Sequence, residues 1–547
     1  MARGSWLLLS YALFALSFGT EGKRRHERVY YVGIIEEDWS YAPSGKNLLN
    51  GQAIGDDEHA SVFLERGRHR IGSVYRKAMY REYTDDTYSH LAPRPDWLGF
   101  LGPILRAEVD DVIIIHLKNF ANRSYSIHPH GLFYEKHTEG ALYPDKTSNA
   151  LKEDDSVPPG GSYTYRWVVK PRFAPTNDDA NCLTWVYHSH VDTPKDVSSG
   201  LIGPLITCKK GTSARNDVDQ DIYLMFSVVD ENLSWYLEEN IQRCIDPDGV
   251  SMDDPDFEES NLMHAINGYT FGNLPGIKLC QHRPVAWHMF GMGNEVDIHS
   301  AFFHGNTLLD RGHRTDTISL FPATFATATM VPKMKGKWLL SCQVNDHLEA
   351  EGCVSTGSMP RCVYWCPKSS EHPVFFSKDN GAIGGDYLKV VYKEYTDSTF
   401  TQVKASPSDH GSLGPVLRAE EGDILNVTFL NKADRNCSIH PHGLHYDKHF
   451  QGASYKDGSH VHPGEKFTYT WQVLEGPSSS DPACIPYMYY SATDPVMDTN
   501  SGLVGPLLVC KRGALGENGI QVGIFTMSLH TLLAHIKRIR PTLRCTS

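Results

Sequence analysis

Two histidine pairs in the first part of the chain have the spacing of metal ligands. His128 and His130 stand in HPHG, and His188 and His190 stand in YHSH. In an extended strand, side chains at positions i and i+2 share a face and lie roughly 7 Å apart. Imidazoles at that spacing can each bind one of two neighbouring metal ions, and imidazole suits copper, zinc or iron. A single His-x-His is usually a chance occurrence, but two pairs at predicted strand ends favour a metal centre.

A third set of chemically active residues lies in the middle of the chain. His299 stands in EVDIHSAFFHG, and Cys342 and His347 stand in WLLSCQVNDH. One histidine upstream of a Cys-x4-His segment is the ligand set of a trigonal blue-copper electron-transfer site. The alternative, which spacing alone leaves open, is a buried cysteine with two surface histidines.

The segments that carry the first histidine pairs occur twice. SIHPHGLFYEKH at 126–137 returns as SIHPHGLHYDKH at 438–449, and LGPILRAEVDD at 101–111 returns as LGPVLRAEEGD at 413–423. Both matches have the same offset, so the repeat unit is about 300 residues long, the size of two domains. Each unit contains short β-rich runs such as DVIIIHLKNF, separated by Pro, Gly and Asp turns. This pattern is typical of antiparallel β-sandwiches.

The second copy of the repeat has lost its beginning and half of its histidines. The counterpart of 28–43 should precede Pro373, but residues 352–372 are Cys-rich and lack strand alternation. A third domain without its first strand is expected to expose a sheet edge. Residues 352–372 are either a linker with its own disulfides or the mark of a sequence shortened by splicing or a gene-model error.

The second HPH, at His440 and His442, has no matching histidine pair. Tyr490 and Ala492 stand where His188 and His190 stand in the first copy. Because two histidines cannot build a cluster alone, we interpret the third domain as a structural copy without a metal cluster.

Composition and charge limit the class of protein. The chain has 547 residues and a net charge of −13, which argues against binding nucleic acid or an anionic membrane surface. Residues 1–22 have one arginine, an apolar run and small residues, which predicts a cleaved secretory signal. No later stretch is long and apolar enough to span a bilayer, so we expect a secreted, soluble protein. Sequons at Asn122, Asn232, Asn426 and Asn436 fit glycosylation in that compartment.

Several motifs identify a family resemblance. WLGFLGPILRAE, HPHGLFYEKHTEGALYPD, LTWVYHSHVDTPKD and FGMGNEVDIHSAFFHG resemble the hephaestin and ceruloplasmin family of multicopper ferroxidases, densely over 28–350 and well over 373–519. The resemblance implies an all-β fold of tandem cupredoxin-like β-sandwich domains, two complete and a third truncated at its start. The expected division is a signal peptide at 1–22, domains at 23–212 and 217–351, a Cys-rich junction at 352–372, a partial domain at 373–513 and a basic tail at 514–547.

The resemblance also implies roles for the histidines and for other residues. His128 corresponds to a type 2 copper ligand, and His130, His188 and His190 correspond to type 3 ligands. His299, Cys342 and His347 correspond to the type 1 ligands of the second domain, whose axial position here is Gly352. Glu295 matches an acid of an iron site. A calcium loop would use the carboxylates of Asp154 and Asp155 and the carbonyls of Lys136 and Leu151.

Four of the cysteines recur at matching positions of the repeat. Cys182 with Cys208, and Cys484 with Cys510, occupy the same place in each copy and are expected to form matching disulfides. In the family, Cys280 pairs with a cysteine at the end of its domain. Cys353, Cys362 and Cys366 are the candidates here, and the sequence does not choose among them.

The implied activity is oxidation of Fe²⁺ with reduction of O₂ to water, with copper as cofactor. The family closes its trinuclear cluster with two further histidine pairs, one of them a His-Cys-His that this sequence does not contain. We therefore expect half a cluster, which another chain or a longer product would complete. The alternatives are a non-catalytic copper-binding or decoy protein, and a copper-free scaffold like the A domains of coagulation factors.

Overall fold

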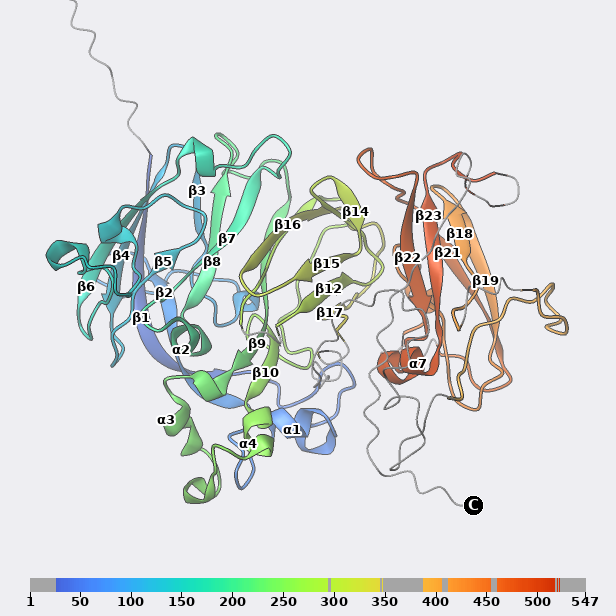
Figure 1. The fold of residues 1–547 in the computed structure, drawn as a ribbon, viewed down its shortest axis with the longest axis horizontal. Coiled ribbons are helices and arrows are strands. Elements are labelled where there is room, and N and C mark those ends of the chain that lie inside the picture. Colours follow the sequence, from blue (N-terminus) through green and yellow to red (C-terminus); the bar gives the residue numbers. More distant parts are fainter. Residues whose placement is uncertain are drawn as a thin grey trace, which may run out of the picture.

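β-strands arranged in three successive sandwiches make up the molecule (Figure 1). The structure is a computed structural model and describes residues 26–293, 297–344, 347, 387–405, 412–453, 460–516, 519 and 521. Helices within these residues are short, so the predicted all-β fold class is confirmed. We call the units formed by β1–β8, β9–β17 and β18–β23 the first, second and third sandwich.

The first sandwich consists of two four-stranded sheets. One has the strand order β2-β1-β4-β6 and the other the order β3-β8-β7-β5. The strand β1 is the centre of the first sheet because it pairs antiparallel with β2 and parallel with β4. Aliphatic side chains that alternate along β1 and β4 fill the space between the sheets. The strands are β1 (Glu27–Ser40), β2 (Val74–Tyr83), β3 (Leu105–Glu108), β4 (Val112–Asn119), β5 (His128–Pro129), β6 (Ser162–Val168), β7 (Cys182–His188) and β8 (Ile202–Cys208).

The second sandwich has a large and a small sheet. The six-stranded sheet has the order β10-β9-β11-β16-β13-β14, and the three-stranded sheet has the order β15-β12-β17. The small sheet matters for chemistry because β12 begins at His299 and β17 ends at Cys342. The strands are β9 (Gln220–Asp230), β10 (Leu262–Ile266), β11 (Val285–Gly291), β12 (His299–Phe303), β13 (Leu308–Asp310), β14 (His313–Thr315), β15 (Thr317–Leu320), β16 (Thr324–Met330) and β17 (Leu340–Cys342).

The third sandwich repeats the first in reduced form. Its sheet β18-β23-β22-β20 matches β3-β8-β7-β5, whereas its other sheet has only β19 and β21 in the described part of the chain. The strands are β18 (Leu417–Glu420), β19 (Ile424–Leu430), β20 (His440–Pro441), β21 (Lys466–Gln472), β22 (Cys484–Tyr490) and β23 (Val504–Cys510).

Short helices connect the strands. The repeat extends to α2 and α7, since Asp192 and Asp494 each cap a helix that has a proline in its first turn. The α-helices are α1 (Ala60–Leu64), α2 (Thr193–Ser198), α3 (Leu237–Ile241), α4 (Pro255–Ser260) and α7 (Pro495–Ser501). The 3₁₀ helices are η1 (Ile54–Asp56), η2 (Asp96–Leu98), η3 (Lys136–Thr138), η4 (Asn149–Leu151), η5 (Pro171–Phe173), η6 (Glu231–Leu233), η7 (Pro247–Gly249) and η10 (Lys448–Phe450). Among the helices that the structure describes, none has the length and hydropathy to cross a lipid bilayer.

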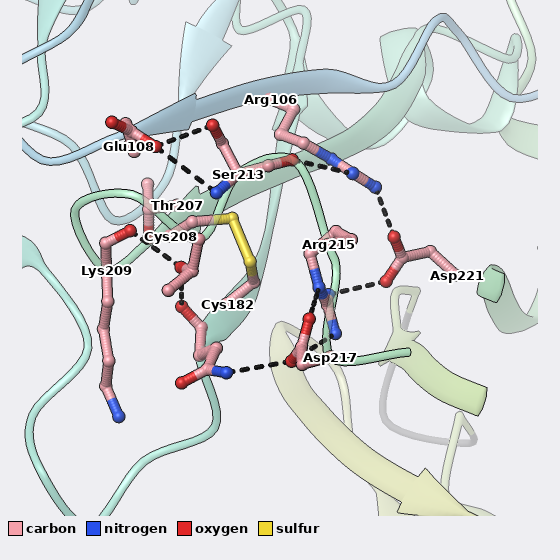
Figure 2. The surroundings of a disulfide bond; sticks show 12 residues. Arg106, Glu108, Cys182, Thr207, Cys208, Lys209, Ser213, Arg215, Asp217 and Asp221 are labelled. Atoms are coloured by element: carbon pink, nitrogen blue, oxygen red, sulfur yellow. Dashed lines mark hydrogen bonds and ion pairs between the residues drawn. A yellow bond between two sulfur atoms is a disulfide. The ribbon is translucent and has the colours of Figure 1, made fainter. Parts of the chain in front are cut away.

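Besides a core cluster of its own, each of the first two sandwiches contributes to one shared hydrophobic cluster. Residues of the first, such as Phe63 and Val186, lie in the same buried cluster as Met263 and Phe290 of the second. A polar network lies beside this core, near a disulfide (Figure 2). There Asp221 of β9 accepts hydrogen bonds from Arg106, at 2.7 Å, and from Arg215, at 2.6 Å. The two sandwiches are therefore joined by both apolar and charged contacts.

Polar contacts join the second and third sandwiches. Arg314 donates to Glu475 at 2.9 Å, and Asp481 accepts a hydrogen bond from the backbone of Arg314 at 2.9 Å. A buried pair also links the two, because Nδ1 of His442 lies 2.8 Å from Oδ2 of Asp316. This boundary places the second HPH motif against the small sheet of the second sandwich.

Candidate metal centres

The four histidines of the first sandwich form one cluster. The strands β5 and β7 are neighbours and pair His128 directly with His188, which brings both His-x-His motifs to the same end of the sheet. Nε2 of His130 lies 3.0 Å from Nε2 of His188, and the ring centroids of His128 and His190 are 5.1 Å apart. Two nitrogens at that separation can both lie about 2 Å from one metal ion. The closest approach is thus between the motifs, whereas the sequence indicated spacing only within each motif.

Backbone contacts orient two of these rings. Nδ1 of His128 lies 2.6 Å from the carbonyl oxygen of Glu139, and Nδ1 of His188 lies 2.9 Å from that of Ser189. Each Nδ1 therefore carries the proton, and each Nε2 has the lone pair that a metal needs. Burial lowers the pKa of His128 to about 4 and that of His188 to about 3, so both rings are neutral at pH 7.

Exposure distinguishes the members of this cluster. His188 is buried, at 2% exposure, whereas His128, His130 and His190 are half-buried. Phe325 of β16 packs against His130 with ring centroids 5.7 Å apart, so the second sandwich shields one side. The cluster fits copper through its donor set, and its accessible rings leave room for further ligands.

The second sandwich contains a compact set of two nitrogens and one sulfur. Ligand atoms of His299, Cys342 and His347 all lie within 4.8 Å of one another, and the three residues are buried. Sγ of Cys342 lies 3.2 Å from Nδ1 of His347 and accepts a hydrogen bond from the backbone of Ser300 at 3.3 Å. Burial lowers the pKa of His299 and of His347 to about 3. A buried thiol beside two neutral imidazoles fits copper, because thiolate and imidazole are its preferred donors.

Sequence spacing missed two neighbours of this set. The ring of His264, on β10, lies 5.1 Å from that of His347, and its buried Nδ1 has no hydrogen-bond partner among the described residues. Oδ1 of Asp297 lies 3.3 Å from Nε2 of His299. A lone histidine in a strand carries no spacing signal, so only the fold could place His264 here. Asp297 stands two residues before His299, and that proximity was the available signal.

Two predicted site residues cannot be placed. Glu295, expected at an iron site, and Gly352, expected at the axial position, lie outside the described residues. Both expectations stay predictions.

The predicted calcium loop gathers buried carboxylates. Asp154 and Asp155 are 0% and 1% exposed, and within the described part of the chain Oδ1 of each is buried without a hydrogen-bond partner. Burial raises the pKa of Asp154, although its Oδ2 accepts a hydrogen bond from Gly140. Unpartnered carboxylate oxygens of this kind fit a hard cation.

Lysines also reach this loop, which the sequence did not predict. Nζ of Lys152 lies 2.6 Å from Asp155, and Nζ of Lys136 lies 2.6 Å from Asp145. Lys136 lies in η3 and Leu151 in η4, so both predicted carbonyl donors come from segments beside Asp154 and Asp155. A bound cation would share the carboxylates with these ammonium groups.

The third sandwich keeps the geometry of the HPH motif but not its partners. His440 pairs with Tyr490 across β20 and β22, and Ala492 is buried nearby. Phe302 of the second sandwich stacks on His442 with ring centroids 4.0 Å apart. Nε2 of His440 and of His442 are buried and find no hydrogen-bond partner in the residues that the structure describes. Aromatic rings therefore lie beside the nitrogens where the first sandwich offers histidines.

The structure contains both disulfides that the repeat predicts, and it shows the surroundings of the sequons. Cys182–Cys208 and Cys484–Cys510 join β7 to β8 and β22 to β23. Cys280 is exposed, and its three candidate partners lie outside the described residues. Asn122 and Asn426 are exposed and Asn436 is half-buried, whereas the amide of Asn232 donates to Asp230 and to the carbonyl oxygen of Glu258.

Comparisons with known proteins agree with this arrangement. A family model described as multicopper oxidase matches residues 99–211 and 389–514. The chain is 52% identical to human ferroxidase HEPHL1, covering 91% of this chain and 47% of the relative. It is 50% identical to mouse hephaestin, covering 95% and 49%, and 43% identical to human ceruloplasmin, covering 94% and 53%. It thus spans about half the length of these relatives. The resemblance found in the motifs is confirmed, and the chain belongs to the multicopper oxidase family of hephaestin and ceruloplasmin.

Proposed function

We propose that this chain is a copper-binding part of a multicopper ferroxidase, with Fe²⁺ and O₂ as substrates. The observation that carries the proposal is the set formed by His299, Cys342 and His347, whose ligand atoms converge within 4.8 Å in a buried environment. The names of the relatives support ferroxidase chemistry, since human HEPHL1 is described as a ferroxidase. We assign this set to type 1 copper, which supplies a one-electron redox couple there.

We assign the four histidines of the first sandwich to half of a trinuclear cluster. His128 would hold type 2 copper, and His130, His188 and His190 would hold type 3 copper. The contacts of His128 to Glu139 and of His188 to Ser189 fix each ring with Nε2 available. The half-buried rings can accept ligands from another chain or from a longer product. Reduction of O₂ by this chain alone is not expected, because half of the implied ligands would have to come from elsewhere.

The residues next to Cys342 determine the route by which an electron could leave the type 1 site. Its neighbours in sequence are Ser341 and Gln343, where the family's cluster-linked site has histidines. The covalent route from thiolate to cluster is therefore lacking at Cys342. We propose that this site takes one electron at a time and passes it through the protein matrix.

The domain bounds, the calcium site, secretion and glycosylation are proposals as well. We place domains at 23–212, 217–351 and 373–513 and a calcium ion at Asp154 and Asp155 with the carbonyls of Lys136 and Leu151. We infer a secreted glycoprotein of iron and copper homeostasis, which the signal-like residues 1–22 and the two disulfides support. Asn232 is the sequon least suited to a glycan, because its amide nitrogen is already engaged.

Copper content of the purified chain, with the EPR and visible spectra, tests the proposal. One copper with an intense blue thiolate band is the expected result and means that the type 1 site works while the cluster is unassembled. Four coppers, part of them EPR-silent, would show that the cluster forms between chains. A chain that binds no copper would be a scaffold, and the proposal would be wrong. A copper chain that oxidises no Fe²⁺ in any assembly would favour the non-catalytic alternative.

A further inference from the structure

The third sandwich contains a His-x-His pair that belongs to none of the centres described above. His460 and His462 flank Val461 in the sequence HVH. The backbone of Val461 forms an antiparallel bridge with Cys437, donating to its carbonyl oxygen at 2.8 Å and accepting from its amide at 3.2 Å. The chain is therefore extended at this point, and the side chains on either side of Val461 share a face. His462 is exposed and His460 is half-buried, so a dissolved ion can reach the pair.

The two imidazole rings are closer to each other than those of the other three His-x-His motifs. Their centroids lie 5.0 Å apart, and the ring planes are nearly perpendicular, at 88°. In the other motifs the centroids are 5.7, 5.6 and 6.2 Å apart, in the order of the chain. Two imidazoles that each bind one ion at about 2 Å have centroids roughly 4.5 to 5.2 Å apart when the two bonds make an angle of about 90 to 110°. The rings of His460 and His462 thus have the spacing of two ligands of a single ion.

A side-chain amide orients the ring of His462. Nδ1 of His462 lies 2.8 Å from Oδ1 of Asn436, the residue opposite it across the bridge. An amide oxygen only accepts hydrogen bonds, so Nδ1 carries the proton and Nε2 has the lone pair. Ligating histidines usually have such a partner on the other ring nitrogen, and losing it commonly weakens metal binding by about 10- to 100-fold. Asn436 is therefore a positioning residue for this pair.

The repeat shows that the donor atoms of this loop differ between the two copies. Val157 of the first sandwich forms the same bridge that Val461 forms in the third. Around these valines, DDSVP at 154–158 corresponds to GSHVH at 458–462. The first copy has the two buried aspartates that fit a hard cation, and the third copy has neither of them but gains both histidines. Carboxylate oxygens are thus replaced by imidazole nitrogens, which suit zinc and copper rather than calcium.

We propose that His460 and His462 chelate one divalent zinc or copper ion at the surface of the third sandwich. Asn436 holds the ring of His462 with Nε2 directed to the ion. Two imidazoles fill only part of the coordination shell of either ion, so positions are left for water or for a further ligand. None of these residues belongs to the candidate copper centres, so this site and the proposed function can fail independently.

Histidine footprinting of the full chain tests the proposal, with Zn²⁺ as the added ion. Diethyl pyrocarbonate acylates imidazole nitrogens that have a free lone pair, and peptide mass spectrometry measures the rate at each histidine. A nitrogen bound to zinc does not react. We expect zinc to slow the acylation of His460 and His462 together, at a concentration at least about tenfold below the one that slows acylation of His59. His59 is the internal reference because it is exposed and has no histidine two positions away in the sequence.

Variants at three positions show whether the two histidines act as a pair. His460→Ala should raise the zinc concentration that protects His462 by at least about tenfold, whereas His449→Ala, at an exposed histidine of the same sandwich, should change it by less than about twofold. Asn436→Ala should weaken the protection by about tenfold. Asn436→Asp also removes the sequon but keeps an oxygen acceptor, so it should not weaken the protection.

Two results would overturn the proposal. Equal acylation rates of both histidines with and without zinc would mean that no metal site exists here. Protection of His462 that is unchanged in His460→Ala would mean that zinc binds single histidines and that the pair is not a chelate.

Discussion

His440 lies directly opposite Tyr490 across β20 and β22, with ring centroids 5.4 Å apart. The first sandwich has the same register, with His128 opposite His188. The backbone of the third sandwich thus keeps the geometry of a histidine cluster, and side-chain identity removes it. Restoring the histidines with Tyr490→His and Ala492→His should increase the copper bound per chain.

The control for that double variant is Tyr490→Phe with Ala492 unchanged. Because Tyr490 is 4% exposed, either change at this position should cost about 1–3 kcal/mol of unfolding free energy. Copper content by atomic absorption separates the two, and an unchanged stoichiometry in the double variant would mean that Phe302 and its neighbours block the site.

Cys342→Ser should abolish the blue absorption band of the copper-loaded chain. A hydroxyl replaces the thiolate that gives a type 1 site its charge-transfer absorption. The control is Ser341→Ala, one residue away on β17, which leaves the thiol in place and should keep the band. Visible and EPR spectra of the two variants at equal copper loading provide the measurement. A blue band in Cys342→Ser would assign the chromophore to another thiol.

Calcium should raise the thermal midpoint of the chain. A ligand at 100 times its dissociation constant stabilises the folded state by about 2.7 kcal/mol. Asp154→Asn should remove this effect because it replaces one of the two buried carboxylates, whereas exposed Asp86→Asn should retain it. Differential scanning calorimetry with calcium and with EDTA makes the comparison. A calcium shift that persists in Asp154→Asn would place the cation elsewhere.

The contribution of Asp221 to the free energy of unfolding, at the contact between the first and second sandwiches, should decrease at acidic pH. Burial raises the pKa of its carboxyl, but the hydrogen bond from His288 and the charges of Arg106 and Arg215 outweigh this and lower it to about 2. Since an unfolded aspartate has a pKa of about 3.9, the ionised group stabilises the fold above about pH 4. That contribution is lost as the pH falls toward 2.

Asp221→Asn tests this at two pH values. It should lower the free energy of unfolding by roughly 2 kcal/mol at pH 7 and flatten its pH dependence between pH 4 and 2. Urea denaturation of this variant and of Asp253→Asn, an exposed carboxylate on the same sandwich, provides the comparison. A pH dependence unchanged in Asp221→Asn would show that other carboxylates control acid unfolding.

Local spacing explains which parts of the fold and site the sequence could predict. The spacing of Cys342 and His347 suggested a ligand set with His299 but left open two surface histidines. The pairing of β12 with β17 and the burial of all three residues decide between the two. The repeat likewise predicted both disulfides, because paired cysteines recur at matching positions. The absence of a β1 counterpart before Pro373 predicts an incomplete sheet, and this stays a prediction because residues 348–386 lie outside the described part of the chain.

Contacts between strands that are far apart in the sequence could not be predicted in this way. The approach of Phe302 to His442, and of His264 to His347, depends on how separate strands pack, which no periodicity encodes. The ion pairs of the calcium loop were missed for a related reason. The sequence named Lys136 only for its carbonyl, and only the fold brings the ammonium groups of Lys136 and Lys152 to Asp145 and Asp155.

The hydrophobic cluster that the first and second sandwiches share bears on how such proteins arose. Phe63 and Phe290 belong to one buried cluster, so either sandwich alone would leave a large apolar face in water. A duplication that copied both sandwiches together keeps that face covered in each copy. The spacing of the repeat, about the length of two domains, is what such an ancestral pair would leave behind.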